Sequence, residues 1–263
     1  MKNKLFLFSF LVLTTLGACA TDENTNEISD PPVLPKTISY KYPDFPEQNA
    51  NITLAYDGNK IVNSTKKDSR TVFTYDGNVI VKQVKYFLQN GKETKFTEVY
   101  YSYENGKLKT RTIRESFSQN YPEGQYIYKT VYTHTSDALI TYINYSVNAD
   151  TKIETKDTNG NLTYSNGNLT KEEQFSGTSK SERVYEYDSK NNPYKNILGF
   201  DLLLNEIDNY AKNNRTKTIR SEVGLPVANY LTNYTYNEDG YPSKSTSFTS
   251  DGKTIEYEIE FTY

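Results

Sequence analysis

Cysteine and histidine, the residues that most often carry nucleophilic or metal chemistry, occur once each, as Cys19 and His134. Nucleophilic catalysis needs a nucleophile beside a base, and a transition-metal site needs several His or Cys ligands. Alternation along a strand places His134 on the same face as Tyr132 and Thr130, which favours a packing role. We therefore expect no catalytic His or Cys, no bound metal and no cofactor.

Paired carboxylates are a second source of chemistry, since glycoside hydrolysis needs only two acids flanking the bond. The chain has 33 Asp and Glu residues, so a carboxylate-pair glycan hydrolase stays an open alternative. Glu256, Glu258 and Glu260 alternate with apolar residues, which is typical of a solvated strand face. Glu172-Glu173 has the character of a surface position. The chain has no nucleophile elbow and no phosphate-binding loop.

One segment, Asp157-Thr158-Asn159-Gly160-Asn161, has some likeness to a calcium loop. Such a loop also needs a late bidentate carboxylate at a fixed offset. The residues from Leu162 to Asn168 supply no acid. We therefore interpret Asn159-Gly160 as a hairpin turn rather than a cation site.

The amino terminus gives Cys19 a definite chemical fate. A basic start is followed by an apolar run from Leu5 to Leu16, which predicts a secretory signal peptide. The run is shorter than the roughly 20 residues of a spanning helix. Leu16-Gly17-Ala18-Cys19 resembles the lipobox of bacterial lipoproteins, which implies cleavage between Ala18 and Cys19 and acylation of the Cys19 thiol. A lone cysteine in an exported chain has no internal partner, which agrees with this interpretation.

These signals predict three regions. Residues 1–18 form the signal peptide, and residues 19–36 form a lipidated tether that ends in a stiffer proline-rich stretch. Residues 37–263 form a single folded domain. The expected location is the bacterial cell envelope, as an outer-membrane lipoprotein that is periplasmic or surface-exposed. Its expected membrane partner is the lipid bilayer, reached through acylated Cys19.

The amino-acid composition predicts a sheet with one buried face and one solvent-exposed face. The formal net charge of −3 gives no indication of nucleic acid as a partner. The chain has 25 Tyr and 12 Phe, although its mean hydropathy is low at −0.77. Tyrosine favours strands, and a sheet with one buried face needs polar residues at every second position.

Strand and turn signals repeat along the chain. Ile255, Tyr257, Ile259, Phe261 and Tyr263 alternate with polar residues, which predicts a half-buried strand. Aromatic residues before Asp-Gly or Asn-Gly pairs predict tight type I′ hairpin turns. The copies begin at Tyr56, Tyr75, Tyr103, Tyr164 and Tyr236, with further turns at Asn90-Gly91, Asn159-Gly160 and Asp251-Gly252.

One region departs from this pattern. Leu202, Leu203, Leu204, Ile207 and Tyr210 recur at roughly helical spacing. The spacing predicts a short helix over 201–211, which would pack on a sheet face or close an open end.

The Tyr-Asp-Gly copies, with the stretches Tyr185 to Asn196 and Tyr234 to Pro242, resemble YD (RHS-like) repeats. They are more closely similar to repeat-bearing Bacteroidetes lipoproteins of unknown function, over roughly Ile52 to Tyr263. The resemblance implies an antiparallel hairpin meander. We expect a mainly β fold, a curved sheet or half-barrel, and the resemblance carries no activity.

These observations favour a non-enzymatic binding or structural module. Dense tyrosine could present a platform for a glycan or protein ligand, although most tyrosines, including Tyr257 and Tyr263, are expected to build the core. Two alternatives stay open. One is a carrier of lipid or another apolar ligand in a half-barrel concavity, and the other is the glycan hydrolase.

Overall fold

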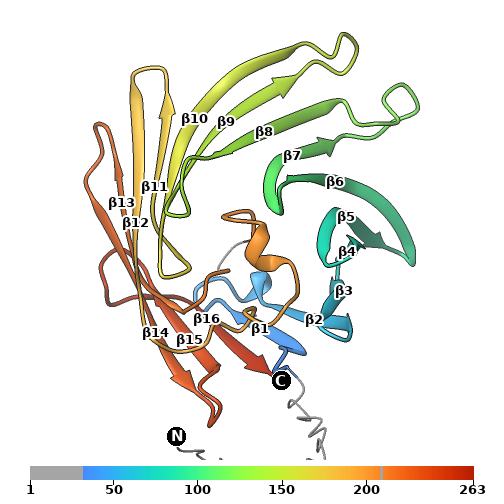
Figure 1. Cartoon of the computed structure of the whole chain (residues 1–263). Coiled ribbons are helices and arrows are strands. Elements are labelled where there is room, and N and C mark those ends of the chain that lie inside the picture. The colour runs from blue at the N-terminus through green and yellow to red at the C-terminus, as the bar shows by residue number, and fades with distance from the viewer. Residues whose placement is uncertain (1–31, 208–209) are drawn as a thin grey trace, which may run out of the picture. The chain divides into compact units, whose positions relative to one another are not determined.

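Sixteen antiparallel strands follow one another around a closed barrel in the computed structural model, which describes residues 32–207 and 210–263 (Figure 1). Strands that are neighbours in sequence are neighbours in the barrel. The first strand closes the ring by pairing with the last, with Ile38 opposite Phe261 and Tyr40 opposite Ile259. The signal peptide, Ala18, Cys19 and the tether up to residue 31 lie outside the described residues.

The strands are β1 (Thr37–Lys41), β2 (Ala50–Asp57), β3 (Lys60–Lys66), β4 (Ser69–Asp76), β5 (Val79–Gln89), β6 (Lys92–Glu104), β7 (Lys107–Glu115), β8 (Tyr126–His134), β9 (Leu139–Val147), β10 (Glu154–Ser165), β11 (Asn168–Ser176), β12 (Ser179–Tyr187), β13 (Arg215–Glu222), β14 (Ala228–Tyr236), β15 (Pro242–Phe248) and β16 (Ile255–Thr262). Two short 3-10 turns, η1 (Pro46–Gln48) and η2 (Phe200–Leu202), complete the regular elements of the described residues.

Ring closure shows that the expected open curved sheet or half-barrel is wrong. Turn and alternation signals specify which strands are neighbours along the chain. They do not specify whether the first and last strands meet, because that pairing joins residues more than 200 positions apart. Closure removes both exposed sheet edges, which would otherwise recruit other strands.

The predicted alternation of the last strand is confirmed from Tyr257 onward, whereas a register shift leaves Glu256 without a paired residue on β15. Ile259 and Phe261 belong to the hydrophobic core or pack against it. Glu258 and Glu260 lie on the opposite face, where they form ion pairs with Lys244 (2.7 Å) and Lys41 (2.6 Å). The inner face of β16 is therefore largely apolar, and its outer face carries charge.

Tyrosines that precede the repeated turns share one structural role. Tyr75 lies opposite Ile80, and Tyr103 lies opposite Leu108, with a register shift beside each pair. Such a bulge increases the local strand twist, which helps a sheet curve into a barrel. The tyrosine and aliphatic side chains pack in or against the core. The same pairing and shift occur at Tyr56 and Tyr164. Tyr187 and Tyr236 show the register shift alone, opposite Arg215 and Pro242.

The hydroxyl groups of four of these tyrosines donate to backbone carbonyls, whereas that of Tyr236 donates to the Asp188 carboxylate and that of Tyr164 is buried without a partner. Tyr103 donates to the carbonyl of Ile80 at 2.7 Å, and Tyr187 donates to that of Leu169 at 2.6 Å. His134 occupies the equivalent place in β8, with its Nε2 2.8 Å from the carbonyl of Leu108. His134 therefore lies on the inner face, as alternation predicts, and it also lines a cavity in the lumen.

Two turn chemistries serve these hairpins. Asn105-Gly106 and Asn166-Gly167 have positive φ at both residues, as a type I′ turn requires. In the Asp-Gly hairpins, Gly58 and Gly77 alone are positive and occupy the first central position, which is typical of a type II′ turn. Asn159-Gly160 is not a turn, so that prediction was wrong. Both residues lie within β10, paired with Phe175 and Gln174.

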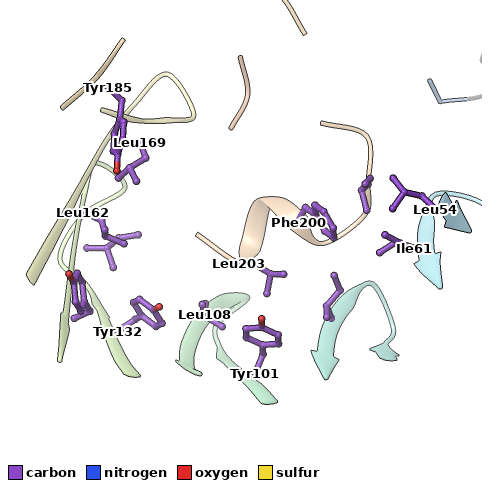
Figure 2. Packing of buried hydrophobic residues seen from close by; sticks show 14 of the residues in the cluster. Leu54, Ile61, Tyr101, Leu108, Tyr132, Leu162, Leu169, Tyr185, Phe200 and Leu203 are labelled. Carbon is purple, nitrogen blue, oxygen red and sulfur yellow. The ribbon is translucent and has the colours of Figure 1, made fainter. Parts of the chain in front are cut away.

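The described residues of the connection between β12 and β13, 188–207 and 210–214, fold into the ring of strands, and we call them the plug segment (Figure 1). The predicted helix over 201–211 is wrong. Only η2 is helical, and turns and bends follow it in the described residues, with 208–209 outside them. Phe200 and Leu203 project from this segment among the inward side chains of the wall, Leu203 toward Tyr101 and Leu108 (Figure 2). Its leucines recur because wall surrounds the segment, not because one helical face is buried.

Candidate functional site

A barrel of this strand number encloses more space than wall side chains alone can fill. The plug segment occupies part of that space, and specific contacts hold it. Tyr75 donates from its hydroxyl to the carbonyl of Leu198 at 3.0 Å. The Asn196 amide contacts the Tyr241 hydroxyl at 2.8 Å. We call the barrel end that carries this segment and the Tyr-Asp-Gly turns the plug end.

The plug segment also contacts the wall through a buried acid, Glu206. The Glu206 carboxylate, 5% exposed, accepts hydrogen bonds from Arg111 of β7 and Tyr132 of β8. Burial raises the pKa of Glu206, and the charge of Arg111 opposes that rise. Glu206 therefore joins the plug segment to the inner wall through an ion pair with Arg111 and a hydrogen bond from the neutral hydroxyl of Tyr132.

Arg111 also begins a chain of polar inward side chains across neighbouring strands. Its guanidinium donates to Thr130 Oγ1 at 2.9 Å, and Thr130 donates to Asn144 at 2.8 Å. Asn144 donates to Thr158 at 2.9 Å, and Gln174 donates to the same hydroxyl at 3.3 Å. The inner wall therefore changes along the barrel axis, from aliphatic and aromatic near the plug end to polar beyond it.

A cavity of about 1080 Å³ remains between the plug segment and the wall from β7 to β13. It slightly exceeds the 300–1,000 Å³ typical of small-molecule sites. Turn residues Asp137, Ala138 and Asn166 lie at its plug-end rim. Its apolar lining comes from both wall and plug and includes Leu108, Ile140, Leu169, Leu204, Ile207 and Tyr210.

Some charged side chains that line this cavity form ion pairs and others do not. Glu172 accepts from Arg183 at 3.3 Å, Tyr185 at 3.0 Å and Asn205 at 3.3 Å. Arg215 instead stacks its guanidinium over the Tyr185 ring, 4.3 Å from the centroid. No ion pair of Arg215 is found among the described residues. Lys195 and Lys212 add positive charge to the lining, and Asp201 adds negative charge.

A second cavity, of about 370 Å³, lies beside the first. Arg183, Arg215 and Thr218 line both cavities. The rest of the second lining comes mainly from β13 to β16 and from Asn192 to Tyr194 of the plug segment. The lumen thus keeps open space on two sides of the same arginine pair.

The outer wall carries clustered charges on its strands. Glu98 of β6, with a side chain 9% exposed, lies 3.0 Å from Lys82 and 3.3 Å from Lys95. Although burial acts against it, these lysines lower the pKa of Glu98. Glu173 of β11 contacts Lys180 at 2.8 Å and Lys171 at 3.0 Å, and these lysines lower its pKa to about 2.

The acids weighed from sequence fall on both faces. Glu258 and Glu260 lie outside as predicted, but Glu256 lines the second cavity instead. The predicted surface position is wrong for Glu172, which lines the first cavity, and holds for Glu173. The segment Asp157–Asn161 is part of a strand. No group of three His, Cys, Asp or Glu residues gathers for a metal within the described ranges, and no helix there could cross a membrane.

Sequence reasoning missed Arg111, Glu206 and Arg215. Alternation along β7 and β13 would have assigned each arginine a face, but which face is inner follows only from the neighbouring strands. Glu206 lies on an irregular segment, where no periodicity assigns a face. These residues come together only because the plug segment lies inside the ring of strands.

Comparison with known proteins gives a fold likeness. No family model matches the chain, and no curated protein matches it. A porin-like protein from Bacteroides vulgatus ATCC 8482 is similar in structure, with a TM-score of 0.57 and 16% identity, over 88% of this chain and 99% of that one. A porin-like protein from Bacteroides uniformis ATCC 8492 has a TM-score of 0.35 and 11% identity, over 87% of this chain and 97% of its own. The first likeness shows a shared barrel fold, whereas the resemblance to YD repeats stays a prediction.

Proposed function

We propose that this chain is a non-enzymatic binding protein of the bacterial envelope, tethered through acylated Cys19, whose barrel stands in water and binds a small, partly apolar ligand in its lumen. The observation that carries the proposal is the cavity of about 1080 Å³ between wall and plug segment. Its lining combines aliphatic and aromatic groups with a few charged ones. That combination is typical of small-molecule sites.

The outer wall supports a barrel in water. A membrane-spanning barrel presents an outward apolar band about 25 Å tall, and lysine or arginine at its midplane costs about 2–4 kcal/mol each. Here β5, β6, β11 and β12 carry clustered lysines and glutamates on their outer faces. A lipid tether gives membrane attachment without placing these charges in hydrocarbon.

The plug segment supports binding over passage. A barrel of this size can leave an aqueous channel. Phe200 and Leu203 fill the lumen near the plug end, and Glu206 joins the segment to the wall. The space that remains in the lumen is a cavity beside these packed side chains rather than an open channel.

The state of the luminal acids also favours binding over hydrolysis. A glycosidase needs one carboxylic acid to protonate the leaving group and a second carboxylate as base or nucleophile. Glu206 is occupied by Arg111 and Tyr132, and Glu172 by Arg183 and Tyr185. Both acids serve structural contacts within the lumen.

The tether is tested by acylation and solubility. In the native host, the unmodified chain is expected to incorporate an alkyne-tagged palmitate and to need detergent for extraction. The Cys19→Ser variant is expected to lose the label and to stay folded and monomeric in detergent-free buffer. A Cys19→Ser chain that still needs detergent would show that the barrel itself lies in the membrane.

The luminal site is tested by filling it. Thr218 lines both cavities, so Thr218→Trp is expected to weaken binding of a neutral solvatochromic dye at least tenfold. Thr133, exposed on β8, gives the matched control, and Thr133→Trp should bind the dye like the parent chain. Equal dye binding by both variants would place the dye outside the lumen and contradict the proposal.

A further inference from the structure

Arg215 is the cation of the lumen whose surroundings most need explanation. Its guanidinium stacks on the Tyr185 ring and lines both luminal cavities. Its Nε is buried without a hydrogen-bond partner. The described residues give it no ion pair. A buried arginine donor is costly to leave unsatisfied, so this group is suited to receive an acceptor from a ligand.

Two of the acids that line the first cavity already have partners. Glu172 is 15% exposed and already accepts from Arg183 and Tyr185. Asp137 at the rim pairs with Lys107 at 2.9 Å. Lys195 and Lys212 line the cavity with no acidic partner among the described residues. Asp201 in the first cavity and Glu256 in the second add negative charge, and neither has an ion pair among the described residues. Lysines and arginines still outnumber acids in each lining, five to three in the first cavity and three to one in the second.

The first cavity also has an apolar lining. Leu108, Ile140 and Leu169 come from the wall, and Leu204 and Ile207 come from the plug segment. A ligand that satisfies both regions has an anionic head and an extended apolar part. Arginine favours carboxylate and phosphate oxygens, because its planar donors match them in pairs.

We infer that the ligand of the lumen is a single-chain anionic amphiphile, whose carboxylate or phosphate head lies at Arg215 and whose tail lies along the leucines and isoleucines of the cavity. The inference rests on the proposed luminal binding and adds the chemical class of the ligand. Stacking on Tyr185 keeps the guanidinium plane in place, so little further ordering is needed when the head arrives.

The test compares ligands that share one alkyl chain and differ in their head group. Hexadecanoate, hexadecyl phosphate, hexadecanol and hexadecylamine compete with a neutral solvatochromic dye on the Cys19→Ser chain. The two anions are expected to bind at least tenfold more tightly than the alcohol, and the amine more weakly still. The ratio between carboxylate and phosphate identifies the preferred head. Failure of all four to bind would remove the proposed function, whereas equal binding of all four would overturn only this inference.

A variant then locates the head. Arg215→Gln is expected to bring the hexadecanoate dissociation constant to within threefold of that of hexadecanol, with hexadecanol itself unchanged. Arg70 of β4, paired with Glu93 on the outer face, gives the control Arg70→Gln, which should keep the full preference. An undiminished preference in a folded Arg215→Gln chain would overturn the assignment of the head. The preference of the parent chain is measured independently of how either variant folds.

Discussion

At the scale of single residues, Gly160 shows how closely the inner wall packs. A Cβ at this position would lie 2.1 Å from the carbonyl oxygen of Glu173 and 2.5 Å from the Tyr142 hydroxyl. The Tyr142 ring lies across the space that a side chain would occupy. We expect Gly160→Val to lower the free energy of unfolding by about 1–3 kcal/mol or to prevent folding. Urea unfolding measures this, and Asn159→Val, one residue away on the outer face, should change it little.

The outward Glu173 predicts a pH dependence. Lys180 and Lys171 lower its pKa from an ordinary 4.5 to about 2. A carboxylate with a lowered folded-state pKa adds stability that is complete above the unfolded value and is lost as pH falls through the folded value. The parent chain should therefore be more stable than Glu173→Gln at pH 6, with the difference shrinking between pH 4.5 and 2. Thermal unfolding across this range measures it, and a constant difference would contradict the assignment.

Alternation assigned faces correctly where a strand is long and regular. It placed Thr130, Tyr132 and His134 together, and the structure confirms that they share the inner face. It places Glu172 and Glu173 on opposite faces, but it does not tell which of them is inner, because Thr170 forms a bulge that resets the alternation before them. A bulge has no signal in hydrophobic pattern alone.

At the scale of elements, the bulged hairpin explains why tyrosine recurs. Tyr103 packs against the core and donates to the carbonyl of Ile80 on the neighbouring hairpin. Tyr103→Phe keeps the ring and removes the donor, so we expect a loss of about 0.5–1.5 kcal/mol. Chemical unfolding measures the change. Tyr86→Phe on the outer face of β5 is the matched control, and an equal loss there would show that the hydroxyl contact at position 103 is unimportant.

The plug segment depends on its buried acid. Glu206→Ala leaves Arg111 without its carboxylate, and removal of one partner of a buried pair costs about 3–5 kcal/mol. Glu206→Gln keeps an acceptor and should cost less. Glu258→Ala breaks an outer pair and is expected to cost about 0–1 kcal/mol. Calorimetric unfolding ranks the three variants, and faster hydrogen exchange over residues 200–207 should accompany the first.

The wrong helix prediction has a physical cause at this scale. Leu202 to Tyr210 shows helical spacing, but spacing indicates one buried stripe only when the element lies on a surface. This segment lies inside a ring, so side chains that point in several directions are all covered. The sequence marked it as an exception to the hairpin pattern and did not indicate that it enters the lumen.

At the scale of the whole molecule, ring closure depends on the total twist and curvature of the sheet, summed over all its strands. Each bulge and tight turn adds a little twist and curvature, and these features are readable one hairpin at a time. Closure requires that their sum bring Thr37–Lys41 beside the last strand. A half-barrel and a closed barrel therefore share the same local signals, and the plug segment is what allows this ring to keep a filled core.

The course of the chain also predicts an orientation at the membrane. The described chain enters at the plug end, where Tyr56 donates to the carbonyl of Pro35 and the cavity rim also lies. Pro35 is 16 residues after Cys19, and that length of chain reaches roughly 55 Å at most. The longest strand, β6, has 13 residues and spans about 40 Å. If Cys19 is acylated as proposed, we expect the anchor to bring the plug end near the bilayer more often than the opposite end.

Labels at the two ends of β4 test this orientation. Asp76→Cys carries a dye at the plug end, and Lys67→Cys carries it in the turn at the opposite end, both at exposed positions. Acylation of Cys19 leaves the introduced cysteine as the only free thiol. In vesicles that contain acceptor-labelled lipid, energy transfer is expected to be greater from position 76 than from position 67. Removing Cys19 should abolish transfer from both. Greater transfer from position 67 would mean that the cavity rim points away from the bilayer, and the ligand would then have to arrive from the aqueous phase.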